Sequence, residues 1–143
     1  MAILLLSSAL AFLLVILVVD YLGKLVIIFL GELDGLLYAL VIFVVLDYIT
    51  GICAAIQAKH LSSNIGAKGI AKKVAIFLVI SVAHVADQYL VDSTDVLRSM
   101  TTLFYLSNEG ISIFENIGKI GIPLPGKLNN LLSRFEDIKN QMK

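Results

Sequence analysis

A few ionisable side chains lie inside long apolar segments of the sequence, where they could do chemistry. Asp47 is near the middle of one apolar segment, and His84 and Asp87 are three residues apart in another. A charged Asp at the centre of a membrane costs about 3 kcal/mol, so we expect Asp47 to face a helix bundle, a water-filled pore or a cation. His84 and Asp87 would share one helix face and could relay protons or couple protonation to assembly. For Asp87 we favour a simpler interpretation, a hydrated carboxylate near the outer membrane surface.

A second set of polar residues, between positions 96 and 119, recurs at helical spacing. Successive members are separated alternately by three and four residues, so all of them lie on one stripe of a helix. This set, the polar stripe, consists of Arg98, Thr101, Tyr105, Asn108, Ser112, Glu115 and Lys119. The segment is predicted to be an amphipathic helix that crosses a membrane only where the stripe meets protein or water. Together with Asp47, His84 and Asp87, the stripe supplies the candidate residues for a pore or for assembly.

The sequence contains no recognisable catalytic or metal-binding set. His60 and His84 are the only histidines, and Cys53 is the only cysteine. Nothing resembles a phosphate-binding loop, a nucleophile elbow or a zinc motif, and the basic residues lack the interleaved aromatics of nucleic-acid-binding surfaces. We therefore expect a protein that is not an enzyme and has no cofactor, metal or nucleic-acid partner. Cys53 is expected to be a small buried hydrophobe.

Three long apolar runs must position these residues. They cover residues 2–30, 36–58 and 74–91, the first being interrupted at Asp20 and Lys24. A helix needs about 20 mostly apolar residues to cross the hydrocarbon core of a bilayer. The chain has 143 residues, 59% of them hydrophobic, and a mean hydropathy of +0.94, which is too apolar for one soluble core. The sequence predicts an all-α membrane protein, a bundle of three to four transmembrane helices plus a C-terminal amphipathic helix.

We predict that the first apolar run is a retained helix and not a cleaved signal peptide. No Lys or Arg precedes it, and no convincing cleavage site follows it. Asp20 and Lys24 are one helical turn apart and can form an ion pair. A continuous helix over residues 3–30 would be about 42 Å long, enough to cross the membrane with tilt or to leave one end among the headgroups.

Glycine, proline and polar residues mark the predicted boundaries. A transmembrane domain is expected over residues 1–126, with helices at about 3–30, 36–58, 74–91 and 96–117 and a lysine-rich loop at 59–73. Residues 92–95, Asp-Ser-Thr-Asp, offer a turn and an N-cap for the fourth helix, and Pro123 and Pro125 prevent its continuation. Residues 127–143 are predicted to form a cytoplasmic amphipathic tail. Its apolar stripe is Leu128, Leu131, Leu132, Phe135, Ile138 and Met142.

The distribution of lysines predicts the orientation in the membrane. Loops rich in Lys and Arg favour the cytoplasmic side, whereas acidic residues contribute little. The loop at 59–73 is therefore placed in the cytoplasm, with the turns at 31–35 and 92–95 outside. Four crossings return the basic tail to the cytoplasm and put both termini there. Three crossings would leave that tail outside, so four are favoured, although the sequence leaves the choice open.

Several segments, in order and at their spacing, resemble the phage-lysis and toxin-secretion holin family of Gram-positive bacteria and their phages. The segments that carry the resemblance are 34–40, 47–51, 68–73, 87–89, 108–113 and 115–125. The similarity extends over about residues 34–132, and the first thirty residues carry no family motif. The resemblance implies a homo-oligomer in the host's cytoplasmic membrane, which forms lesions that release an endolysin or export a large toxin.

Two other functions remain open at the level of sequence. One is a small proton-coupled transport or channel subunit that uses Asp47, His84 and Asp87. The other is a scaffold that recruits a soluble partner through residues 127–143. The leading hypothesis is a holin whose fourth helix turns the polar stripe towards water or neighbouring subunits.

Overall fold

The computed structural model describes residues 2–59, 62–91 and 94–141, and every regular element in these ranges is helical. The predicted all-α class is therefore confirmed, together with the C-terminal helix. The elements are α1 (Ala2–Leu30), α2 (Gly35–Gln57), α3 (Ser63–Ala86), the π-helical turn η1 (Asp87–Val91), α4 (Val96–Lys119) and α5 (Gly126–Gln141).

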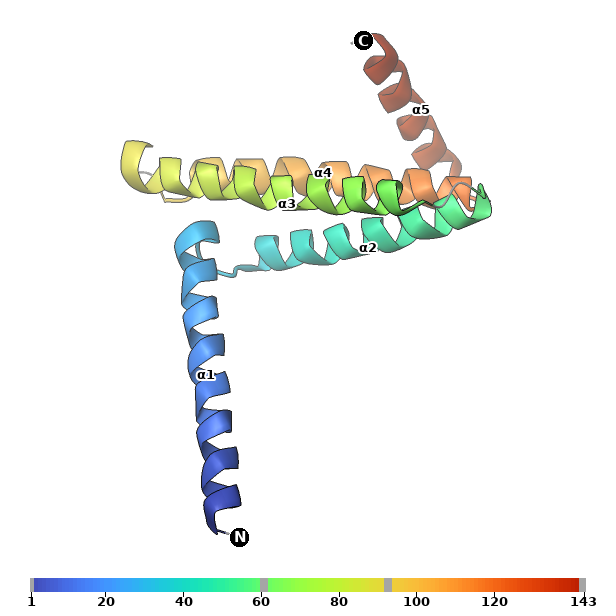
Figure 1. Cartoon of the computed structure of the whole chain (residues 1–143). Coiled ribbons are helices and arrows are strands. Elements are labelled where there is room, and N and C mark those ends of the chain that lie inside the picture. The colour runs from blue at the N-terminus through green and yellow to red at the C-terminus, as the bar shows by residue number, and fades with distance from the viewer. Residues whose placement is uncertain (1, 60–61, 92–93, 142–143) are drawn as a thin grey trace.

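Helices α2, α3 and α4 lie side by side and form the body of the molecule (Figure 1). Their hydrophobic core consists of Leu37, Leu40, Val44, Ile76 and Ile80, flanked by partly buried side chains from α1 and α4. Helix α1 runs across the long axis of this bundle and contacts α3, whereas α5 leaves from the opposite end (Figure 1). The bundle therefore has one small core, and both terminal helices project from it.

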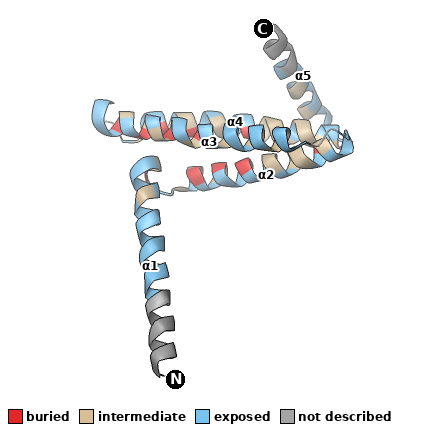
Figure 2. Cartoon of the chain, viewed as in Figure 1, coloured by how far each residue is buried: buried red, intermediate tan, exposed pale blue. Residues whose placement is uncertain are grey.

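Three helices are long and apolar enough to cross a membrane. Their apolar stretches are Phe12–Leu30, Gly35–Gln57 and Gly66–Leu90. The outer surfaces of these helices carry large exposed hydrophobic side chains, and buried residues are confined to the inner faces of the bundle (Figure 2). An apolar exterior of this kind suits a lipid environment. Asp20 and Lys24 form the expected ion pair on exposed α1, at 2.7 Å.

The third helix begins at Ser63, earlier than Val74, where it was predicted to begin. The prediction treated Gly66 and Gly69 as loop formers, but both pack against the Tyr48 ring of α2. Glycines at such a contact allow two helices to approach closely. The consequence is that Lys73 belongs to a helix and faces the other two helices of the bundle, instead of lying in a loop.

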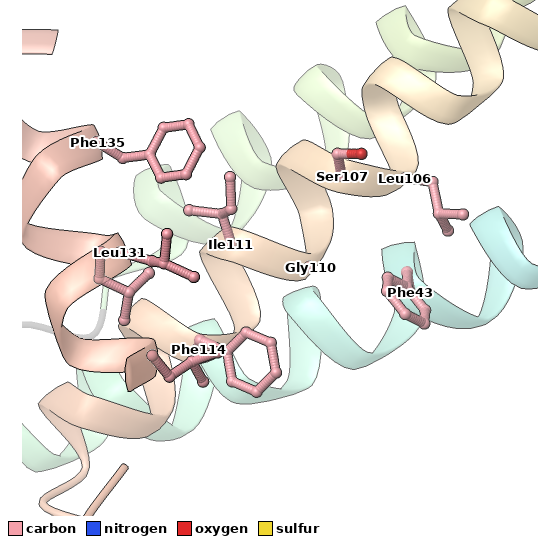
Figure 3. Close-up of a pocket in the computed structure, with 10 residues that line it drawn as sticks. Phe43, Leu106, Ser107, Gly110, Ile111, Phe114, Leu131 and Phe135 are labelled. Carbon is pink, nitrogen blue, oxygen red and sulfur yellow. The ribbon is translucent and has the colours of Figure 1, made fainter. Parts of the chain in front are cut away.

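Helix α5 packs its apolar side chains towards α4. Leu128, Leu131, Leu132 and Phe135 line a groove whose other walls come from Phe43 of α2 and from α4. Figure 3 shows Leu131 and Phe135 facing Ile111 and Phe114 of α4 across this groove. The predicted apolar stripe of the tail thus faces the protein over these four residues. The side chain of Ile138, and Met142 altogether, lie outside the described residues.

Candidate functional site

The first polar cluster lies between α2, α3 and α4, and we call it the lysine cluster: Asp47, Lys73, Glu109 and Asn116. The Lys73 ammonium donates to Asp47 Oδ2 at 2.7 Å and to a carboxylate oxygen of Glu109. The side chains of Lys73 and Glu109 are only 11% and 2% exposed. One lysine faces two carboxylates, so in the ionised form the cluster carries one more negative charge than positive.

Asn116 completes this cluster from the next turns of α4. Its amide nitrogen donates to Asp47 Oδ1 at 3.1 Å and lies 3.4 Å from the Thr50 hydroxyl. Both carboxylate oxygens of Asp47 therefore have a partner, one on α3 and one on α4. Removing one member of a buried ion pair costs about 3–5 kcal/mol, because the other charge stays buried without a partner. The lysine cluster thus joins α4 to α2 and α3, two helices long and apolar enough to cross a membrane.

The second polar cluster lies at the other end of the bundle, and we call it the arginine cluster: Arg98, Asp34, Asp87, His84 and Asp95. Arg98 is 3% exposed. Its guanidinium donates to the Leu30 carbonyl at 2.6 Å, to the Glu32 carbonyl and to Asp34 Oδ2 at 2.9 Å. The planar fork of arginine suits several acceptors at once. Arg98 therefore fastens the start of α4 to the turn that joins α1 and α2.

Asp34 is both a partner of Arg98 and the N-cap of α2, where it accepts from the Leu37 N–H at 2.8 Å. Partial burial raises the pKa of the Asp34 carboxyl. The hydrogen bonds from Leu37 and Arg98, with the charge of the guanidinium, outweigh that effect and hold the pKa below its ordinary value of 3.8. Asp34 is therefore kept as the carboxylate that Arg98 requires.

Asp87 caps α4 from the end of α3. Its two carboxylate oxygens accept from the backbone N–H groups of Leu97 at 3.0 Å and Arg98 at 2.8 Å, and its side chain is fully buried. The prediction of a hydrated Asp87 is therefore wrong, because free N–H groups at a helix N-terminus attract a carboxylate. Asp95 occupies the N-cap position, as predicted, but its side chain makes no capping hydrogen bond. It lies 3.1 Å from His84 Nδ1 instead.

Gly31 allows the close packing of the arginine cluster. Its φ of +78° is in the left-handed region, and a Cβ atom there would lie 2.9 Å from Arg98 Nε and 3.0 Å from the His84 ring. A side chain at this position would strain the backbone, and its Cβ atom would lie too close to Arg98. The glycine that was predicted only as a turn residue is thus needed for the contact between α1 and α4.

The polar stripe divides when it is placed in the bundle. Arg98 is buried, and Tyr105 packs against the core. Thr101, Ser112 and Glu115 are half-buried, whereas Asn108 and Lys119 are exposed. The face of α4 that points into the bundle carries Arg98, Thr102, Glu109 and Asn116. This face is rotated about the helix axis relative to the predicted polar stripe. These inward residues are separated by four, seven and seven positions, which also places them on one helix face, a signal that would have found Glu109 and Asn116.

Four of the candidate residues fall into the two clusters. Asp47 belongs to the lysine cluster, while His84, Asp87 and Arg98 belong to the arginine cluster. Lys73 and His84 are about 16 Å apart along α3, at 1.5 Å per residue. The three residues that the proton-coupled transport hypothesis requires are thus divided between two clusters. Sequence reasoning missed Lys73 because it placed that residue in a loop.

The described residues contain no group of three or more His, Cys, Asp or Glu side chains that could hold a metal ion. Cys53 is exposed on α2, so the prediction that it is buried is wrong. Its side chain points away from the bundle, on a helix apolar enough to lie in lipid.

Comparison with known proteins places these features in a family. Residues 24–137 match the model of the bacteriophage holin family. A protein of Bacillus phage phi105 described as a probable holin is 37% identical over 111 residues, which cover 78% of this chain and 81% of the phage protein.

Bacterial relatives are also similar. An uncharacterised 14.9 kDa protein of Clostridium perfringens is 41% identical over 109 residues, 76% of this chain and 83% of its own. An uncharacterised protein of Listeria monocytogenes is 43% identical over 106 residues, 74% of this chain and 75% of its own. No solved structure matches the chain. From the family match over most of its length and from the similarity to the phage protein, the chain belongs to the bacteriophage holin family.

Proposed function

We propose that the protein oligomerises in the bacterial cytoplasmic membrane and opens lesions that release an endolysin or a large toxin. Membership of the holin family supports a role in lysis. The observation that carries the proposal is the lysine cluster, which puts an ammonium and two carboxylates between helices with lipid-compatible outer surfaces. A bundle built in this way encloses charged side chains that would face water if the helices separated.

These enclosed charged side chains provide a mechanism for the opening of a lesion. While α2, α3 and α4 are packed, Asp47, Lys73 and Glu109 satisfy one another. If α4 moved away into lipid, each group would lose its partners at a cost of several kcal/mol. Water in a lumen between several copies would replace those partners. Opening is therefore favourable only when helices separate and water enters together, which makes lesion formation a cooperative event.

The proposed orientation has the lysine-rich segment at the start of α3 in the cytoplasm and the turn at residues 31–34 outside. The exposed Lys68 and Lys72 support it through the preference of basic residues for the cytoplasmic side. Four crossings, with both termini inside, would require α1 to align with the bundle by rotation about residues 31–34. In a Cys53→Ser background, Leu33→Cys should react with an impermeant thiol reagent in intact cells and Ser63→Cys should not. The opposite labelling would reverse the orientation.

Expression in a bacterium tests the function directly. The wild-type chain is expected to stop growth abruptly and, when co-expressed with a cytoplasmic muralytic enzyme, to lyse the culture. Asp47→Asn should insert normally, since it removes a charge from the membrane interior, but it should shift the onset of lysis because Lys73 loses one carboxylate. A membrane-inserted wild-type chain that never releases the muralytic enzyme would refute the proposal.

A further inference from the structure

Helix α4 carries two polar faces, and only one of them is satisfied within the chain. The inward face makes the hydrogen bonds of the lysine and arginine clusters. The neighbouring face, which we call the flank, consists of Thr101, Asn108 and Ser112. Their side chains make no hydrogen bond or ion pair with any residue that the structure describes, and Asn108 is exposed. The flank therefore lacks the partners that the adjacent face has.

The flank is level with a stretch of α3 that is long and apolar enough to cross a membrane. Asn108 is next in sequence to Glu109, which binds Lys73, and Lys73 lies within the membrane-length stretch Gly66–Leu90. An amide at this depth has no hydrogen-bonding partner in lipid, and such groups are normally satisfied by another helix or by water. The flank consequently needs an occupant that the described part of the chain does not provide.

Helix α5 does not fill this role. On α4 it faces Ser107, Gly110, Ile111 and Phe114, which line the apolar groove (Figure 3). Further along α4, Glu115 and Lys119 border a different groove with polar residues of α5, among them Asn129 and Ser133. Neither groove includes a residue of the flank, so the flank remains open beside α5.

We propose that the flank is a contact between two copies of this chain, in which Asn108 of one copy pairs with Asn108 of the other. A carboxamide carries both donors and acceptors, so it is complementary to itself across a two-fold axis. The flank is also uncharged, because Glu109 is turned inward to Lys73 and Arg98 is buried. Two identical flanks therefore meet without repulsion between like charges. Ser112, one turn from Asn108, and Thr101, two turns from it, add hydroxyls to this face. The inference rests on the proposed function, for which it supplies a step in assembly.

Cysteine cross-linking in isolated membranes tests the contact. In a Cys53→Ser background, Asn108→Cys should form a disulfide-linked dimer under mild oxidation. Ser107→Cys, exposed on the adjacent face of α4, and Val45→Cys, exposed on α2, are the matched controls and should give several-fold less dimer. Equal yields at all three positions would overturn the proposal. So would an Asn108→Cys chain that stays monomeric and reacts readily with a water-soluble thiol reagent, since that result would place water on the flank.

Substitution of Asn108 provides a second measurement. Asn108→Leu should reach the membrane at the wild-type level but shift the oligomer in mild detergent to smaller species, and Asn108→Gln should restore the distribution. If Asn108→Leu leaves the distribution unchanged, the contact lies elsewhere. Wild-type lysis without Asn108 cross-linking refutes the contact alone, whereas cross-linking without release of a muralytic enzyme refutes the proposed function alone.

Discussion

The two polar clusters of the bundle use similar residues in different surroundings. The arginine cluster lies where α1 and α3 end and where α2 and α4 begin, and Arg98 binds two backbone carbonyls and a carboxylate that is 41% exposed. The lysine cluster lies between α4 and the apolar helices α2 and α3, and its contacts are mainly between side chains, with Asp47 only 13% exposed. The arginine cluster satisfies the polar groups of helix ends close to water. The lysine cluster supplies, between helices, the hydrogen-bonding partners that water would otherwise provide.

This difference predicts how each cluster responds to damage. Groups at helix ends can be rehydrated when a partner is removed, because solvent is near. Groups between membrane helices cannot, because lipid offers no donor or acceptor. Although Arg98 makes more hydrogen bonds than Lys73, we expect the lysine cluster to be the more sensitive of the two.

The largest effect is expected from Lys73→Met. It leaves Asp47 and Glu109 facing each other without a cation, and should lower the free energy of unfolding in detergent by about 3–5 kcal/mol. Lys72→Met, at an exposed neighbouring position on α3, is the control and should have little effect. Adding Asp47→Asn and Glu109→Gln to Lys73→Met should recover much of the loss. Equal stability of Lys73→Met and Lys72→Met would contradict the role of the cluster.

Arg98→Met should have a smaller effect. Hydrogen bonds to a charged group contribute about 1.5–3 kcal/mol, and Asp34 and the Glu32 carbonyl can be rehydrated when the guanidinium is lost. We expect a decrease of about 2–3 kcal/mol in the free energy of unfolding, measured in the same detergent. Arg98→Lys should fall between wild type and Arg98→Met, because a lysine keeps the charge but cannot contact all three acceptors. A loss greater than that of Lys73→Met would reverse the comparison.

A backbone change separates packing from charge in the arginine cluster. Gly31→Ala should lower the free energy of unfolding by about 1–2 kcal/mol, the cost of a left-handed conformation for a residue with a Cβ atom, and should displace Arg98. Gly35→Ala is the matched control, since a Cβ atom there would meet nothing within 4 Å. Comparable melting temperatures for the two variants would show that the close contact at Gly31 is unimportant.

The smallest effect is expected from pH. The pKa of Asp34 is lower in the folded protein than its ordinary value of 3.8, so its contribution to stability is complete above that value. The contribution is lost as the pH falls through the folded pKa. Wild-type stability should therefore fall more steeply below about pH 4 than that of Asp34→Asn, in acid titrations followed by circular dichroism. Identical acid profiles would show that the Arg98–Asp34 pair does not contribute.

Sequence patterns predicted local features well where one helix alone determines them. The apolar run at residues 36–58 corresponds to Gly35–Gln57, because hydropathy and length are properties of a single segment. The Asp20–Lys24 pair also follows from spacing alone. The start of α3 was mispredicted because Gly66 and Gly69 were judged by their intrinsic preference, whereas in the bundle both lie in a helix beside the Tyr48 side chain of α2.

The sequence by itself determined that the chain is helical and belongs in a membrane, that its fourth helix is amphipathic, and which family it resembles. Only the tertiary structure decided which polar residues meet. Lys73 pairs with residues 26 and 36 positions away. Glu109 makes this bond, whereas the adjacent Asn108 has no hydrogen-bonding partner among the residues that the structure describes. Composition and periodicity are properties of one segment. A buried ion pair depends instead on the rotation and register of helices that are distant in sequence. Leu37 and Leu40 of α2 meet Ile80 of α3 in the core in the same way, and no single segment encodes that contact.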